Sequence, residues 1–189
     1  MHHREMGRPS STGHLIHRTF EGARHHLWRR ERRLKGSEIR VAGRDLWILH
    51  PSGHPAPQGA TPGSVQLLLL DASWRETRPM VREVVSWGRL VSLPMEGESR
   101  FLLRNQPEEG RFSTVEALLF LLRSFGLEQA HSSLLFQFEL HVYASLRSRG
   151  RKAMALDFLK QSSLEKSDPV LVGELNRPRL FRLPELKTV

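Results

Sequence analysis

The sequence contains no cysteine. Disulfide bonds, thiolate metal sites and thiol nucleophiles are therefore excluded, because each of them needs a cysteine sulfur. There is also no apolar run near the length of a membrane span, and the first residues, MHHREMGRPSS, lack the apolar segment of a signal peptide. These absences predict a cytoplasmic protein that neither enters a membrane nor holds a metal ion.

Motifs of several common enzyme classes are absent too. No glycine-rich phosphate loop occurs in the sequence, which argues against a kinase, a P-loop NTPase or a Rossmann dehydrogenase. A serine hydrolase would place its nucleophile in a G-x-S-x-G turn with a partner histidine, whereas Ser73 stands in the sequence DASW. The chemistry has to come from another arrangement of residues.

Positive charge is what the chain has in excess. Its 189 residues carry a formal net charge of +9 at pH 7, with a sequence pI of about 11.1. A surplus of Lys and Arg favours a polyanionic partner such as RNA, since each neutralised phosphate releases counterions. A generally basic protein selected for solubility is the alternative. The length suits one domain with a proper core, and we expect a monomer.

The clearest single element is the stretch at residues 64–74, SVQLLLLDASW. Its apolar run leaves no alternation for a solvent face and is short for a helix, so it predicts a strand buried on both faces. Asp71, Ser73 and Trp74 follow directly. In an open α/β sheet, ligands bind beyond the carboxyl ends of the strands, so these three side chains are the first candidates for a site.

Three segments resemble the DTW-domain family. Residues 71–74, DASW, resemble its D-x-T/S-W signature, and residues 104–117, RNQPEEGRFSTVEA, resemble its second block, R-x-x-P followed by S-T-x-E-A. Residues 3–15, HREMGRPSSTGHL, are similar to its H-x-x-E-x-x-R-P-x-N-T-G-x-L segment. The segments occur in the family's order. The sequence departs from the family in lacking the Cys pairs of many members and the strand expected just before His3.

The resemblance implies an α/β fold with a mostly parallel sheet flanked by helices, SPOUT-like and with a C-terminal knot. It also implies an enzyme that uses S-adenosylmethionine to place a 3-amino-3-carboxypropyl group on a uridine of tRNA. The domain would span residues 1–160, followed by a C-terminal tail at residues 161–189. The catalytic residues would be Asp71, Ser73 and Trp74, and the cofactor-binding residues would be Leu93, Arg104, Ser113, Thr114 and Glu116.

Hydrophobic patterns predict further elements on either side of this site. We expect helices at residues 19–35, 77–87, 112–125, 127–149 and 154–159, with Pro79 in the first turn of the second one. Strands are expected at residues 39–41, 45–49, 89–93 and 99–103, and a Pro- and Gly-rich loop at residues 50–63. By composition alone, residues 1–13 are a disordered leader. The polar tail from residue 161 either lies over the domain or stays mobile.

The sequence STVE at residues 113–116 has two interpretations. Ser113 and Glu116 stand three apart before an apolar run, which is the pattern of a capping box. A helix N-terminus also attracts an anion, here the carboxylate of S-adenosylmethionine, and the two interpretations do not exclude each other. Arg104 likewise suits a carboxylate or an RNA phosphate, with a salt bridge to Glu116 as the alternative.

Asp71 is the candidate base. The implied reaction needs attack on Cγ of the methionine moiety, loss of 5′-methylthioadenosine and removal of the N3 proton of the uridine. A carboxyl at the end of a dry strand is expected to have a raised pKa, which suits a base. Pairing with the ligand's ammonium or capping the next turn are the alternatives. Ser73 suits a hydrogen-bond donor or a helix cap, and Trp74 suits a stacking partner or a core residue.

A second set of residues is expected to bind RNA. The predicted helix at residues 19–35 carries a dense set of cations, which repel one another unless an outside anion relieves them. A solvated helix face is the alternative. The leader residues are carried over from the resemblance. The expected RNA-binding residues are thus His3, Glu5, Arg8, Arg29, Arg30 and Arg33.

Two other functions stand beside this hypothesis. One is an RNA-binding module that keeps the fold without the activity, suggested by the strand and the Cys pairs that are missing. The other is the same transfer to ribosomal RNA, because D-x-S-W with Ser occurs in related ribosomal RNA enzymes. Release of methylthioadenosine separates the first from an enzyme, and the identity of the modified RNA decides the second.

Overall fold

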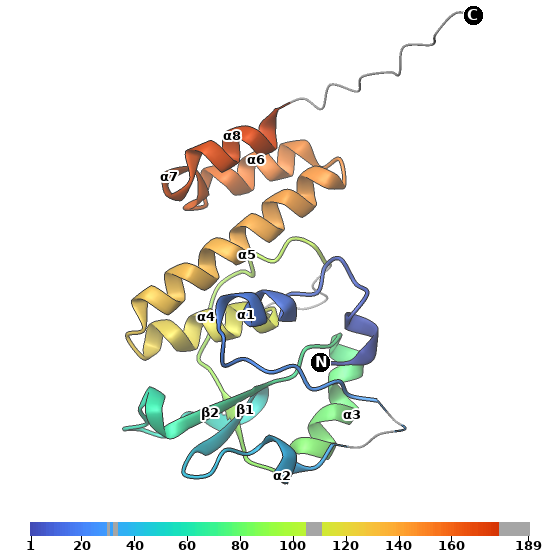
Figure 1. Cartoon of the computed structure of the whole chain (residues 1–189), viewed down its shortest axis with the longest axis vertical. Helices are drawn as coiled ribbons and strands as arrows, with labels where there is room; N and C mark the ends of the chain where they lie inside the picture. The colour runs from blue at the N-terminus through green and yellow to red at the C-terminus, as the bar shows by residue number, and fades with distance from the viewer. Residues whose placement is uncertain (30, 32–33, 105–110, 178–189) are drawn as a thin grey trace, which may run out of the picture.

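A small parallel sheet forms one end of the molecule (Figure 1). The structure is a computed structural model of the whole chain, and it describes residues 1–29, 31, 34–104 and 111–177. Strand β1 (Asp45–Pro55) lies between β2 (Val65–Leu69) and β3 (Arg89–Ser92) in a three-stranded sheet. Both pairings are parallel, with Ile48 opposite Leu68 on one side and Leu90 on the other. The prediction of a parallel sheet flanked by helices is confirmed, while the SPOUT relation and the C-terminal knot stay predictions.

The most deeply buried strand is β1, not β2. Residues 46–49 of β1 are at most 9% exposed, whereas residues 67–69 of β2 are half-buried. The strand predicted at residues 64–70 is therefore confirmed, but its burial on both faces is wrong. It lies at the edge of the sheet, and an apolar run alone does not distinguish an edge strand from a central one.

Strand β1 continues into the segment where a loop was expected. Its register against β3 slips, so that Leu49 and His54 both pair with Val91. Gly53 permits this close passage, because a Cβ there would lie 2.6 Å from the backbone nitrogen of Val91. Residues 50–53 lie between the two pairings, and His50 belongs to the wall of a cavity described below.

Helix α3 (Trp74–Val84) follows β2 in the chain, and helix α4 (Thr114–Ser124) follows β3. Helix α3 begins three residues earlier than predicted, so Pro79 lies inside the helix and not in its first turn. Helix α4 begins at the expected capping box and ends before Gly126, which has a φ of 68°. The inner face of α4 packs Ala117, Leu121 and Phe125 against the sheet.

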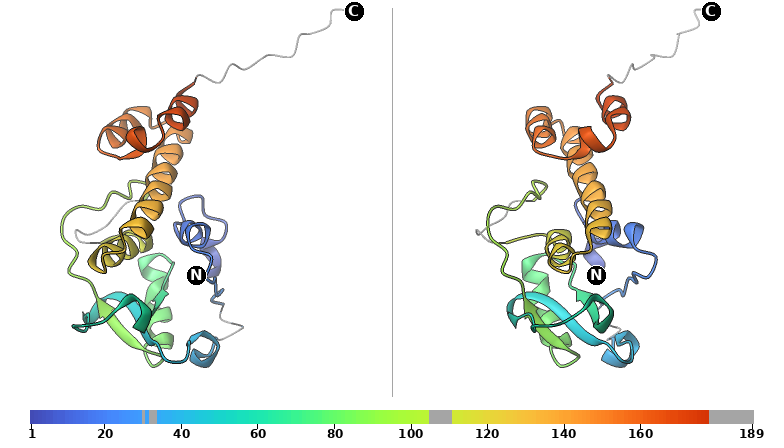
Figure 2. Two further views of the ribbon diagram at one scale, coloured as in Figure 1. Left: turned by 60° about the vertical axis from the view of Figure 1, so that its left-hand side comes forward. Right: turned by 90° about the vertical axis from the view of Figure 1, so that its left-hand side faces the viewer.

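The remaining helices build the larger core around α5 (Glu128–Ser148), which extends away from the sheet (Figure 2). Helix α1 (Gly13–Thr19) and α4 lie against one part of α5, and α6 (Lys152–Lys160), α7 (Leu164–Ser167) and α8 (Pro169–Asn176) gather at its far end. Phe138 and Tyr143 of α5 are almost fully buried. The Tyr143 hydroxyl donates to Asn176 Oδ1 at 2.6 Å, so the chain as far as residue 176 lies over α5.

The helix predicted at residues 19–35 is wrong. Helix α1 ends at Thr19, the chain then runs without a helix to Trp28, and a short helix, α2, spans Gly36–Ile39. Trp28 is buried and pairs with His2 in a parallel bridge. A tertiary contact that buries tryptophan therefore overrides the weak helical pattern of a segment crowded with cations.

Two short strands are also wrong. Ile39, expected in a strand, belongs to α2. Residues 99–103, expected in another strand, form no ladder because α4 binds them: the Glu116 carboxylate accepts the backbone N–H of Arg100 at 2.7 Å and the Ser99 hydroxyl at 2.9 Å. The polar partner of this segment lies sixteen residues further along the chain, where periodicity gives no sign of it.

The leader is ordered, contrary to what its composition suggests. A short 3-10 helix, η1 (His3–Glu5), follows His2, whose backbone N–H donates to the Asp71 carbonyl at 2.9 Å. Glu5, Ser11 and Thr12 are buried. The segment singled out by its resemblance thus packs directly against the end of β2.

A half-buried histidine, His141, lies where α1 packs on α5, and its environment disfavours protonation. Nε2 of His141 is buried and has no hydrogen-bond partner among the described residues, and its ring lies edge-on to His14 at 5.2 Å. Burial, with the neighbouring His14, Arg149 and Arg18, lowers the pKa of His141 to about 4.

We therefore expect the protein to lose stability as the pH falls from 6.5 towards 4, because His141 binds a proton in the unfolded chain over this range and stays neutral in the folded protein. His141→Leu is expected to flatten this part of the pH profile in thermal unfolding, by a few degrees at about 2–4 °C per kcal/mol. His17→Leu, at an exposed position of α1, is the control. Equal acid sensitivity of wild type and His141→Leu would contradict the assignment.

Candidate active site

Asp71 lies at the point where the end of β2, the leader and α4 meet. Its side chain accepts hydrogen bonds from the Ser11 hydroxyl at 3.0 Å and the Thr114 hydroxyl at 3.4 Å. Burial raises the pKa of Asp71, and the nearby Glu5 carboxylate raises it further, while the Ser11 hydrogen bond and Arg104 oppose the rise. The raised pKa expected from the sequence is confirmed, and it suits a base.

Gly13 sets the position of this carboxyl. It is the first residue of α1, and a Cβ built on it would lie 2.4 Å from Asp71 Oδ2. Only a residue without a side chain lets the leader approach this closely. Ser11 and Gly13 were not among the predicted site residues, although both fall inside the leader segment that resembles the family.

A buried ion-pair cluster fixes the leader beside Asp71. The Glu5 carboxylate is fully buried and accepts hydrogen bonds from Arg8 Nη1 at 2.6 Å and from Arg104 Nη2. Arg104 Nε also donates to the Ser10 hydroxyl at 3.0 Å. The alternative pairing of Arg104 with Glu116 is therefore wrong. Because Glu5 is buried, it serves to anchor Arg104 and does not present a surface for RNA.

Asp71 borders a large cavity. The cavity has a volume of about 1080 Å³, and its wall combines apolar side chains with a few polar groups, as small-molecule sites do. It brings together seven of the eight residues predicted for catalysis or cofactor binding, all except Glu116. Those seven are Asp71, Ser73, Trp74, Leu93, Arg104, Ser113 and Thr114.

Capping boxes hold two of these residues in place. Ser73 Oγ donates to Glu76 Oε2 at 2.6 Å at the start of α3, and Ser113 accepts the Glu116 backbone N–H at 3.3 Å at the start of α4. Glu76 and Glu116 reach back to the backbone N–H groups of Ser73 and Ser113. The capping interpretations of both serines are confirmed, and Glu116 sits behind the wall of the cavity.

Trp74 is a wall residue and not a core residue. It is half-buried, with the Arg111 guanidinium 4.7 Å from the centre of its ring and the His50 ring edge-on to it at 6.4 Å. The interpretation of Trp74 as a core plug is therefore wrong. Arg111 and His50 were not predicted as site residues, and His50 stood in a segment whose pattern indicated only a loop.

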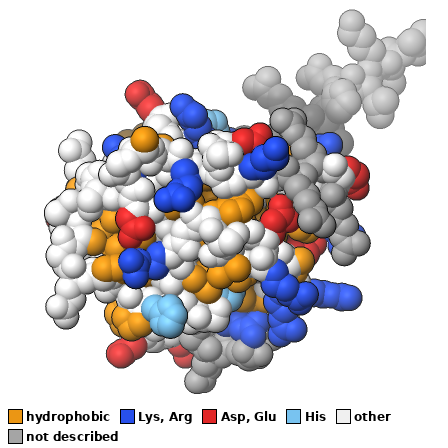
Figure 3. All heavy atoms as spheres, turned by 90° about the horizontal axis from the view of Figure 1, so that it is seen from below, with side chains coloured by type: hydrophobic (Ala, Val, Ile, Leu, Met, Phe, Trp, Pro, Cys, Tyr) orange, Lys and Arg blue, Asp and Glu red, His pale blue; other side chains and the backbone are white. Residues whose placement is uncertain are grey.

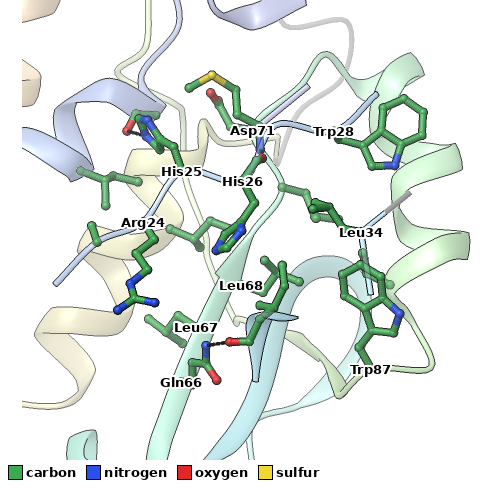
Figure 4. A pocket seen from close by; sticks show the side chains of 18 of the residues that line it. Arg24, His25, His26, Trp28, Leu34, Gln66, Leu67, Leu68, Asp71 and Trp87 are labelled. Atoms are coloured by element: carbon green, nitrogen blue, oxygen red, sulfur yellow. Dashed lines mark hydrogen bonds between the residues drawn. The ribbon is translucent and has the colours of Figure 1, made fainter. Parts of the chain in front are cut away.

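A second cavity lies behind Asp71, along the outer edge of β2 (Figure 4). It has a volume of about 490 Å³ and is lined by β2 on one side and by residues 22–28 on the other, with Asp71 near one end. Gln66 spans its floor by donating to the Ile39 carbonyl at 2.7 Å. Asp71 and Thr114 border both cavities, so the two are separated by the end of β2.

The residues predicted to bind RNA are dispersed. Arg29 is exposed, and His3 is exposed on the leader, whereas the carboxylate of Glu5 is buried and pairs with Arg8, which is partly exposed. Arg30 and Arg33 lie outside the described residues. Among the described residues of the segment 24–35, namely 24–29, 31, 34 and 35, no cation lies within a helix.

The comparison with protein families decides the membership of the chain. A family model, described as the DTW domain, matches residues 1–146. The chain belongs to the DTW-domain family. The match covers the leader, the sheet, α3, α4 and almost all of α5. Membership of this family is consistent with a role in tRNA modification. No curated protein and no solved structure matches the chain closely enough to count as a relative.

None of the helices in the described part has the length and apolar character needed to cross a membrane. Among residues 1–29, 31, 34–104 and 111–177, no three His, Cys, Asp or Glu side chains come together as metal ligands would.

The ion-pair cluster predicts a large cost for removing Arg104. Arg104→Gln leaves the buried Glu5 carboxylate with Arg8 alone, and we expect it to lower the free energy of unfolding by about 3 kcal/mol. Arg89→Gln breaks the half-exposed pair with Asp45 and is expected to cost less than about 1 kcal/mol. Urea unfolding measures both, and Glu5→Gln in the Arg104→Gln background is expected to recover part of the loss. Equal costs for the two single variants would contradict the assignment.

Proposed function

We propose that this DTW-domain protein transfers the 3-amino-3-carboxypropyl group of S-adenosylmethionine to N3 of a uridine in tRNA. The observation that carries the proposal is a buried carboxyl with a raised pKa, Asp71, in the wall of a cavity of about 1080 Å³. When bound, S-adenosylmethionine supplies the alkyl group and, as a sulfonium, a good leaving group. The tasks left to the protein are binding, orientation and removal of one proton.

The residues around the cavity suit a charged nucleoside. Leu49, Leu93 and Phe112 provide apolar surface for an adenine ring. The first turn of α4, at Thr114, and the Arg111 guanidinium provide positive potential for a carboxylate. The Trp74 ring, which already holds the Arg111 guanidinium over one face, is an aromatic surface on which a base can stack. This combination of apolar wall, positive corner and buried carboxyl supports the proposed cofactor.

Asp71 is the group we assign to proton removal. Its two oxygens are held by hydroxyl groups, Ser11 at Oδ2 and Thr114 at Oδ1, so the carboxyl is fixed and desolvated, with no direct ion pair to any described residue. A carboxylate in this setting is a stronger base than one in water, because burial disfavours its charge. Removing the uridine N3 proton raises the nucleophilicity of that nitrogen.

Arg104 and Glu5 act as positioning residues. Their ion pair places Ser10 at the cavity wall and holds the leader beside Asp71, where Ser11 orients the carboxyl. A fixed carboxyl keeps the base within reach of a bound ring, and small displacements of such groups are costly in rate. Asp71 is thus the carboxyl assigned to the reaction, and Glu5 is the carboxyl that holds the leader in place.

Asp71→Asn tests the proposal. With S-adenosylmethionine and tRNA, wild type is expected to release 5′-methylthioadenosine, and Asp71→Asn is expected to lose about 10²–10⁴-fold in kcat while cofactor affinity in calorimetry is retained. Loss of affinity instead would make Asp71 an anchor for the ligand's ammonium. Asp157→Asn, at an exposed site on α6, is the matched control.

The modified nucleoside identifies the substrate. Mass spectrometry of nucleosides from the reacted RNA is expected to show 3-(3-amino-3-carboxypropyl)uridine in tRNA. The same product in ribosomal RNA alone would support the ribosomal alternative. Tight RNA binding with neither cofactor binding nor methylthioadenosine would reduce the protein to a binding module.

The pKa of Asp71 sets the acid limb of the activity profile. Below that pKa the carboxyl holds its proton and cannot accept another, so kcat/KM is expected to rise with pH through a pKa above the ordinary aspartate range. Ser11→Ala removes a hydrogen bond that favours the ionised form and is expected to move this limb to higher pH. An acid limb at the position of an exposed aspartate, unmoved by Ser11→Ala, would argue against Asp71 as the base.

A further inference from the structure

Helix α3 carries a row of arginines on its exposed side. Arg75, Arg78 and Arg82 are spaced three and four residues apart, which places them on one face of the helix. All three are exposed, and none has an ion pair or side-chain hydrogen bond within the part of the chain that the structure describes. The row therefore presents unneutralised positive charge to solvent.

The acidic residues of α3 do not neutralise this row. Glu76 is held at the start of the helix by Ser73 and faces the leader, with Arg8 Nη1 at 3.6 Å. Glu83 accepts a hydrogen bond from Trp28 Nε1 at 2.9 Å. Like charges on one face of a helix repel each other, so the row is best satisfied by an outside anion.

The row leads into the cavity that contains Asp71. Arg75 and Arg78 belong to the cavity wall, and α3 begins three residues after Asp71. Seen from below, Lys and Arg side chains gather on the right-hand side of the molecule, where α3 lies in Figure 1 (Figure 3). From Arg75 to Arg82 the helix rises about 10 Å, the length of about three phosphates along one strand. The matching partner is thus a nucleic acid backbone that runs past the cavity mouth.

The depth of Asp71 restricts the form of that nucleic acid. The residue is only 7% exposed, so a base stacked inside a duplex cannot reach it. A base in a loop can be turned out of its strand and stacked on an aromatic ring, and Trp74 and His50 stand together at the cavity wall.

We propose that the arginine row of α3 binds the phosphates of a single-stranded RNA loop while an unpaired base of that loop enters the cavity towards Asp71. This rests on the proposed function for the identity of the base. It assigns the RNA contact to α3 in place of the segment at residues 24–35, and it makes a loop uridine, not a paired one, the substrate.

The salt dependence of RNA binding tests the row. The variant Arg75→Gln/Arg78→Gln/Arg82→Gln is compared with Arg151→Gln/Lys152→Gln/Lys166→Gln, which removes the same charge from exposed positions beyond α5. The probe is a labelled RNA stem-loop with one uridine in its loop, titrated at several KCl concentrations without cofactor. We expect the slope of log K against log salt to become shallower by about 2 in the α3 variant, at about 0.7 per single-strand phosphate, and to change little in the control.

A duplex of the same composition and a single charge reversal complete the test. Wild type is expected to bind the stem-loop more tightly than the duplex, and Arg78→Glu is expected to weaken stem-loop binding without a change in the unfolding temperature. An unchanged slope in the α3 variant, an equal loss in the control or equal affinity for loop and duplex would overturn the proposal.

These outcomes are separable from those of the proposed function. If methylthioadenosine forms with an RNA whose binding does not depend on α3, only the proposed role of the arginine row is contradicted. Binding that depends on α3 with no methylthioadenosine formed would contradict the transfer reaction and leave the RNA surface in place.

Discussion

The rest of the site depends on the ion pairs that the fully buried Glu5 carboxylate makes with Arg104 and Arg8. Its pair with Arg104 joins two segments that are 99 residues apart in the sequence. A carboxylate cannot be taken out of water without such partners, so the leader and the segment at Arg104 order each other. The leader in turn delivers Ser11 and Gly13 to Asp71. A polar contact between sequence-distant segments therefore determines the geometry of the candidate active site.

The carboxyls around the cavity have divided roles. Glu5 is paired with two guanidinium groups, and Glu76 and Glu116 cap helices α3 and α4. Asp71 contacts only hydroxyl groups at hydrogen-bonding distance among the described side chains. Burial and the neighbouring Glu5 carboxylate therefore raise the pKa of Asp71. The environment, more than the residue type, distinguishes the reactive carboxyl from the structural ones.

The parts of this fold that could be predicted from the sequence are those with local causes. The end of β2 followed by Asp71, the capping box at Ser113 and the long helix α5 each follow from patterns within a few residues. The failures have distant causes. Residues 20–28 avoid a helix because Trp28 pairs with His2, and residues 99–103 avoid a strand because Glu116 binds them. The hydrophobic periodicity within either segment gives no indication of its distant partner.

The same distinction applies to the site. Six of the seven predicted residues meet at one cavity because they follow strand ends or lie at helix starts, which converge on one edge of a parallel sheet, whereas Arg104 comes from an irregular segment. Ser11, His50 and Arg111 were missed because their own neighbours in sequence give no reason to expect a site. Ser11 reaches Asp71 from the leader, while His50 and Arg111 reach the cavity wall from the slipped part of β1 and from the segment before α4. The resemblance of residues 3–15 to a known segment was the one signal that gave weight to the leader.

Gly13 gives the site a property that no functional group reveals. The space beside the Asp71 oxygen is filled by the leader backbone itself, at a distance that would not admit even one methyl group. Evolution at this position is thus confined by volume: an alanine adds no charge, donor or acceptor, yet it would press on the reactive oxygen directly. Homologues that carry a larger residue here are expected to have moved either the leader or the carboxyl, and with it the chemistry.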